Sequence, residues 1–180
     1  MMSPAVVGDV SDEERLVAEL EALGVRYLSR QTSYLAERPR PADALIAGLV
    51  RQPRARVRNA VIAVLLARPD YAAWVPGALA QLQPDGQARL RVLYTAAVAL
   101  QQEHARTLRL FLGPRWHPLP NLFARELGVP ASNKSPQDTL KRLGRLQQQQ
   151  TGAVANWQGT FEDAARRLLR QWELEAQWNQ

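Results

Sequence analysis

Four arginines within eight residues, Arg51, Arg54, Arg56 and Arg58, form the densest group of side chains capable of binding a charged ligand. Each guanidinium presents several N–H donors in one plane, which suits bidentate contacts to carboxylates and phosphates. The surrounding segment, residues 38–68, holds seven arginines and one acid, so it carries a charge of +6, equal to the net charge of the whole chain. This segregation of charge predicts a basic binding edge.

Side chains that would support catalysis or metal binding form no recognisable pattern. The chain has no cysteine, and neither His104 nor His117 has a second histidine or an acid three or four residues after it, so no zinc site is predicted. Glycine-rich phosphate-binding loops and the nucleophile elbow of hydrolases are also missing from the sequence. We therefore expect a protein that is not an enzyme and uses no metal or cofactor.

Tryptophan and arginine dominate the energetically important positions of protein interfaces, which makes the five tryptophans candidates for partner contacts. Trp116 and Trp157 lie in predicted loops and Trp178 lies near the end of the chain. Each loop tryptophan is either an anchor for a partner or a lid over the protein's own core. Trp74 and Trp172 follow helical apolar stripes, so we expect both in the core.

Length and composition predict one globular domain. A chain of 180 residues with 46% hydrophobic residues is long enough for one buried core and short for two. The longest apolar run, residues 60–67, is far shorter than the roughly 20 residues that span a bilayer, and no signal-peptide pattern precedes Ser11. We expect a cytoplasmic protein with no membrane partner, with residues 1–10 as a tail and residues 11–178 as a single helical domain.

Hydrophobic spacing predicts helices along the first half of the chain. Ser11 with Glu14 forms a capping box at the start of the first helix, which ends near Gly24. Apolar residues at helical spacing predict a second helix over 42–50, and the apolar run predicts a buried third helix over 55–67. Another helix is expected from Asp70, and the segment 25–35 is expected to be extended or irregular.

The same signals predict helices along the second half of the chain. A long helix is predicted over 87–109 after a break at residues 84–86, then a short helix over 121–127, a helix over 136–150 and a last helix capped by Thr160. Strand signals are essentially absent. The fold class is therefore all-α, an irregular helical bundle. Seven apolar residues are expected in its core: Val61, Leu65, Leu66, Leu93, Val98, Leu168 and Leu169.

The middle of the chain resembles HEAT and armadillo repeats. Residues 49–66 and 82–100 each contain a leucine, a proline, an Arg-apolar-Arg triplet and an apolar run, with the triplets 33 residues apart. The resemblance covers residues 42–102 and implies antiparallel helix pairs that stack side by side. C-terminal helices are expected over 119–178. The alternative is an irregular bundle in which the spacing of the arginines is accidental.

A second resemblance is carried by three short segments, residues 54–62, residues 121–130 and Asn156-Trp157. They are similar to small helical proteins that are encoded beside minimal nucleotidyltransferases in bacteria. Such companion proteins are often antitoxin-like. The chain lacks the Gly-Ser and Asp-x-Asp pattern of the nucleotidyltransferase itself. The resemblance therefore implies a binding and neutralising role.

These observations favour a non-catalytic interaction module that binds a protein partner with an acidic surface. The predicted contacts are Arg51, Arg54, Arg56, Arg58, Trp116 and Trp157. The alternative is binding of an RNA or DNA backbone through the Arg51–Arg58 edge, although base-stacking aromatics are not interleaved with these arginines. Arginine outnumbers lysine 21 to 2, a bias that GC-rich coding sequence also produces. By the repeat position, we expect Arg58 to be held within the fold and Arg51, Arg54 and Arg56 to be free.

Overall fold

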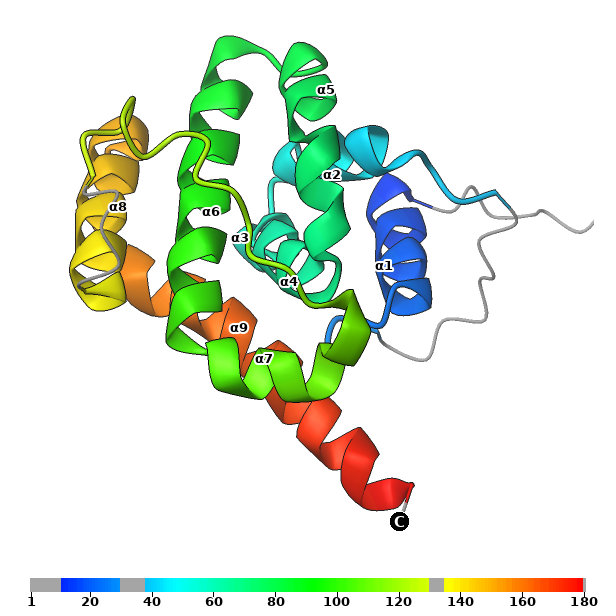
Figure 1. Ribbon diagram of the computed structural model, residues 1–180. Helices are drawn as coiled ribbons and strands as arrows, with labels where there is room; N and C mark the ends of the chain where they lie inside the picture. Colours follow the sequence, from blue (N-terminus) through cyan, green and yellow to red (C-terminus); the bar gives the residue numbers. More distant parts are fainter. Residues whose placement is uncertain (1–10, 30–37, 130–134, 180) are drawn as a thin grey trace, which may run out of the picture.

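A computed structural model describes residues 11–29, 38–129 and 135–179 (Figure 1). All regular structure in these ranges is helical, with no strand, which confirms the predicted all-α bundle. The α-helices are α1 (Asp12–Ala22), α2 (Ala42–Val50), α3 (Ala55–Arg58), α4 (Ala60–Ala67), α5 (Val75–Ala80), α6 (Pro84–Glu103), α7 (Ala105–Leu112), α8 (Pro136–Thr151) and α9 (Trp157–Trp178), and two 3-10 helices are η1 (Pro69–Trp74) and η2 (Gly113–Arg115).

Helix α4 is the centre of the core. All eight of its residues are buried, and it packs against α2, α6, α9 and η1. A helix without a polar face is stable only when other helices cover it on every side. The seven residues predicted for the core are all buried, at most 8% exposed: Val61, Leu65, Leu66, Leu93, Val98, Leu168 and Leu169.

Helices α2, α4, α5 and α6 pack together in the middle of the bundle. Helix α2 packs against α5, and α4 packs against α6, while α2 with α4 and α5 with α6 make fewer contacts. Figure 1 shows α2 next to α5 and α6 running beside them down the middle of the molecule.

Two predicted helices are interrupted where the chain must change direction. The helix expected over 55–67 splits at Asn59 into α3 and α4. The helix expected over 87–109 begins earlier, because Pro84 suits the first turn of α6, and it breaks at His104. After this break, α7 packs against α9 and buries Leu108 and Leu112. Tertiary packing, which has no local signature, sets both breaks.

The short helix predicted over 121–127 is wrong. These residues form turns, because side chains of α6 hold the preceding proline-rich loop in place. The Gln101 side chain accepts from the backbone N–H of Leu119 at 2.7 Å, and the Tyr94 hydroxyl donates to the carbonyl of Pro120 at 2.7 Å. Burial raises the pKa of Tyr94 well above its usual range, so the hydroxyl stays a donor.

The predicted N-terminal cap of the first helix is confirmed, and that of the last helix is corrected. The Ser11–Glu14 capping box is present at the start of α1. Helix α9 begins at Trp157, and its cap is Asn156 in place of the predicted Thr160, whose hydroxyl donates back to the carbonyl of Asn156 at 2.9 Å.

Replacing Asn156 with alanine is expected to lower the free energy of unfolding by about 1 kcal/mol, since its side-chain oxygen accepts from the backbone N–H of Gly159 at 2.9 Å. Thr160→Ala is the matched variant and should have a smaller effect, because Thr160 lies inside the helix. Urea denaturation of both variants checks this. A larger loss for Thr160→Ala would restore Thr160 as the cap.

Two predictions concern segments that lie partly or wholly outside the described ranges. Residues 25–29 contain no regular helix, as predicted, while residues 30–35 lie outside the described ranges. The predicted tail, residues 1–10, also lies outside them. Among the described helices, none combines the length and the apolar character that crossing a bilayer requires.

Candidate functional site

The four predicted edge arginines lie at the turn from α2 to α3. Arg51 follows the last residue of α2, Arg54 precedes α3, and Arg56 and Arg58 lie within α3. Pro53 in the turn lacks a backbone N–H and cannot continue α2, so the chain changes direction here.

Arg58 is held within the fold, as the sequence predicted. One nitrogen of its guanidinium donates to the carbonyls of Gln52 and Pro53, at 2.9 and 3.1 Å. Burial, and then the charge of the nearby Arg89, lowers the pKa of Arg58. Arg89 itself donates to the carbonyl of Val50 at 3.3 Å. Both arginines therefore brace the turn by bonding its carbonyl groups.

The prediction that Arg51, Arg54 and Arg56 are free is wrong in one respect, since each has a partner within the chain. Arg54 pairs with Glu13 of α1 at 2.9 Å, although its side chain stays 71% exposed. The acidic first turn of α1 thus lies against the basic edge and neutralises part of its charge.

Arg51 and Arg56 bond carbonyl groups, which do not neutralise their charge. Arg51 donates to the carbonyl of Gln81, and Arg56 donates to the carbonyl of Tyr27 at 3.0 Å. Neither has a carboxylate partner among the residues that the structure describes, and both are exposed. A bond to a carbonyl fixes a guanidinium in position and leaves its remaining donors and its full charge available.

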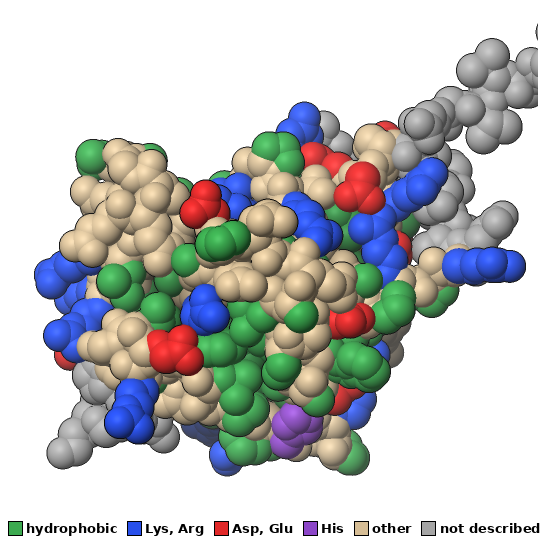
Figure 2. Space-filling model, turned by 90° about the horizontal axis from the view of Figure 1, so that it is seen from above, with side chains coloured by type: hydrophobic (Ala, Val, Ile, Leu, Met, Phe, Trp, Pro, Cys, Tyr) green, Lys and Arg blue, Asp and Glu red, His purple; other side chains and the backbone are tan. Residues whose placement is uncertain are grey.

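The view of Figure 2 shows how this charge is distributed. Acidic side chains lie between the basic ones, so the visible face carries no continuous basic surface. Pairing also neutralises Arg40, which forms ion pairs with Asp12 and Glu19 of α1. The uncompensated charge of the predicted edge is therefore confined to individual arginines, among them Arg51 and Arg56.

A groove of about 420 Å³ lies beside the edge, between α1, α3 and the turn that follows α1. Val17, Leu28 and Val57 supply its apolar part, with Arg54 and Arg56 on the same walls. The seven lining residues are Glu13, Glu14, Val17, Leu28, Arg54, Arg56 and Val57. The sequence did not indicate Val17 and Leu28 as site residues, because only the tertiary fold brings them next to the arginines.

The predicted contact residues Trp116 and Trp157 do not lie in this groove. Both are partly buried against the core. The guanidinium of Arg109 stacks over the Trp116 ring at 5.1 Å, and the indole N–H of Trp157 donates to the carbonyl of Ala153 at 3.2 Å. Their positions fit a lid over the protein's own core.

The two tryptophans predicted for the core, Trp74 and Trp172, differ in how far they are buried. Trp172 is partly buried and packs against the core, with its ring 5.5 Å from that of Phe111. Trp74 is 51% exposed, which corrects the prediction. It ends the 3-10 helix η1, where the three-residue period replaces the α-helical spacing that the prediction assumed.

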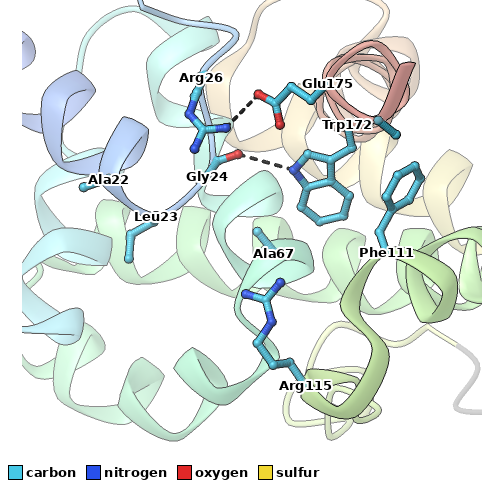
Figure 3. A pocket seen from close by; sticks show the side chains of 10 residues that line it. Ala22, Leu23, Gly24, Arg26, Ala67, Phe111, Arg115, Trp172 and Glu175 are labelled. Atoms are coloured by element: carbon cyan, nitrogen blue, oxygen red, sulfur yellow. Dashed lines mark hydrogen bonds and ion pairs between the residues drawn. The ribbon is translucent and has the colours of Figure 1, made fainter. Parts of the chain in front are cut away.

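A second cavity, of about 430 Å³, lies where the end of α1 meets α4, α7, η2 and α9 (Figure 3). Arg26, Phe111, Arg115 and Trp172 line it. No local pattern in the sequence indicates it, because its walls come from four regions that are far apart in the chain: residues 22–26, Ala67, residues 111–115 and residues 172–176.

Titratable residues form no metal centre in the described ranges. No group of three His, Asp or Glu side chains there is placed to hold an ion. His104 lies at the break between α6 and α7, and His117 is exposed in the proline-rich loop.

The chain matches no protein-family model, no curated protein and no solved structure. The resemblances to HEAT repeats and to antitoxin-like companions therefore stay predictions.

Proposed function

We propose that the protein is a non-catalytic interaction module that binds an acidic protein partner at the turn from α2 to α3. The observation that carries this proposal is the state of Arg51 and Arg56. Both are exposed and anchored to carbonyl groups, and neither has a carboxylate partner in the described chain. Their guanidinium groups are thus held in place while their charge remains available for a carboxylate from outside.

The adjacent groove specifies the partner more closely. Val17, Leu28 and Val57 offer apolar contacts next to Arg54 and Arg56. A segment that fits this arrangement has acidic side chains flanking an apolar one. Burial of the apolar side chain would supply affinity, and the charge pairs would set orientation and the association rate.

Binding of a labelled peptide measures this directly. The probe is a ten-residue peptide in which glutamates flank a central leucine, and its titration is followed by fluorescence anisotropy. We expect the Arg51→Gln/Arg56→Gln variant to lose about tenfold or more in affinity, since hydrogen bonds to charged groups are worth about 1.5–3 kcal/mol each. A peptide with glutamine in place of glutamate should bind as weakly as the variant does.

The matched control is Arg166→Gln/Arg170→Gln, which removes the same charge from exposed positions of α9. It should bind the peptide as the native protein does. Equal losses in both double variants would show that net charge alone attracts the peptide, and the proposed site would be wrong. A ten-nucleotide single-stranded RNA serves as competitor, and tighter binding of the RNA at the same arginines would replace the acidic protein by a nucleic acid.

A further inference from the structure

The cavity between α1, α4, α7, η2 and α9 contains an arginine without a partner. Arg115 is exposed at the end of η2, and no hydrogen bond, ion pair or ring contact engages its side chain in the described part of the chain. Figure 3 shows this side chain extending from η2 toward Ala67. Its planar set of donors is therefore open to an incoming anion.

The other charged groups in the wall cancel each other. Arg26 pairs with Glu175 at 2.7 Å, and Gln171 donates to the same carboxylate oxygen at 2.9 Å. The backbone N–H of Arg26 also donates to the side chain of Gln171, at 2.7 Å. Among the described residues that line the cavity, Arg115 thus provides the uncompensated charge.

Aromatic rings form the opposite wall. The rings of Trp172 and Phe111 lie 5.5 Å apart and tilted by 50°, and the indole N–H of Trp172 donates to the carbonyl of Gly24 at 3.4 Å. This bond fixes the orientation of the indole. A flat apolar group would find a stacking surface here, with Leu23 and Ala67 as further apolar contacts.

We propose that this cavity binds a small organic anion, a flat ring that carries a carboxylate or a phosphate group. The anionic group pairs with Arg115, and the ring stacks on Trp172. The volume of about 430 Å³ lies within the range of about 300–1,000 Å³ that is common for small-molecule sites. The cavity and the groove at the α2–α3 edge share no lining residue, so this inference does not depend on the proposed function.

Isothermal titration calorimetry with simple probes tests both parts of the site. Phenylacetate supplies ring and carboxylate, phenylacetamide is its neutral analogue, and acetate lacks the ring. We expect phenylacetate to bind about tenfold or more tightly than either analogue, because each lacks one of the two contacts. Phenyl phosphate compared with phenylacetate then distinguishes a phosphate ligand from a carboxylate ligand. The NMR signal of the Trp172 indole proton should shift on binding.

The decisive variant is Arg115→Gln, which should bind phenylacetate and phenylacetamide equally. The control, Arg125→Gln, removes an exposed arginine that does not line the cavity, and it should behave as the native protein does. Thermal melting of both variants verifies that they are folded. The proposal fails if the native protein binds neither acid at millimolar concentration, if it does not distinguish phenylacetate from phenylacetamide, or if Arg115→Gln keeps the preference.

Discussion

Replacing Leu65 with alanine is expected to lower the free energy of unfolding by about 3 kcal/mol, one of the two largest effects that we predict. Leu65 is fully buried in the middle of α4, whose eight residues are all buried. The substitution removes the transfer free energy of the side chain and leaves a cavity that well-packed neighbours fill only in part. Because α4 packs against α2, α6 and α9, the loss weakens the packing of the central helix as a whole.

Urea denaturation followed by circular dichroism measures this loss. Leu110→Ala is the matched control, since Leu110 is also a helical leucine but is 81% exposed. It should change the free energy of unfolding by less than about 0.5 kcal/mol. If the two variants were equally stable, α4 would not be the centre of the core.

The second large effect is expected for Arg40→Met. The Glu19 carboxylate is buried, with only 7% of its side chain exposed, and Arg40 pairs with it at 3.2 Å. Removal of the guanidinium leaves a buried carboxylate without its counter-charge. We expect a loss of about 3 kcal/mol, the lower end of the range for buried ion pairs, because the Arg40 side chain keeps 24% of its surface exposed.

The loss should depend on pH. Burial raises the pKa of Glu19 above its ordinary value, although the charge and hydrogen bonds of Arg40 oppose the shift. In the variant the charge and the side-chain hydrogen bond are gone, and only the backbone N–H of residue 40 still donates to Glu19, so the pKa of Glu19 rises further. An acid with a raised pKa in the folded state takes up a proton there before the unfolded chain does, so stability rises as the pH falls through that pKa toward the unfolded value near 4.5.

Unfolding experiments at pH 8 and pH 5 check the sign. The difference between Arg40→Met and the native protein should be smaller at pH 5 than at pH 8. Arg54→Met is the control, because Arg54 also pairs with an acid of α1 but is 71% exposed, and exposed pairs contribute between about 0 and 1 kcal/mol. A loss for Arg40→Met that stays the same at both pH values would exclude ionised Glu19 as its cause.

Sequence patterns were sufficient where a structure depends on neighbours in the chain. The capping box of α1 is a contact between residues three apart, and the sequence predicted it. The buried face of α9, with Leu168 and Leu169, follows from helical periodicity. The bracing role of Arg58 was also predictable, since the carbonyls that it bonds are only five and six residues away.

The tertiary fold alone decided which of the edge arginines is neutralised by a carboxylate. Arg51, Arg54 and Arg56 look equivalent in the sequence, yet one meets a carboxylate and two meet carbonyl groups. These partners lie 29 to 41 residues away, and no local pattern encodes which of them arrives at each guanidinium.

By itself, then, the sequence determined most of the helices, their buried faces and the capping box of α1, because these follow from the periodicity of the chain and from hydrogen bonds over a few residues. Tertiary structure decided the helix breaks at Asn59 and His104, the partners of the edge arginines and the cavity at Arg115. The walls of this cavity include Arg26 and Glu175, which form an ion pair between residues 149 apart in the chain. Such contacts form only when whole helices pack, so their physical cause lies in the fit between distant surfaces.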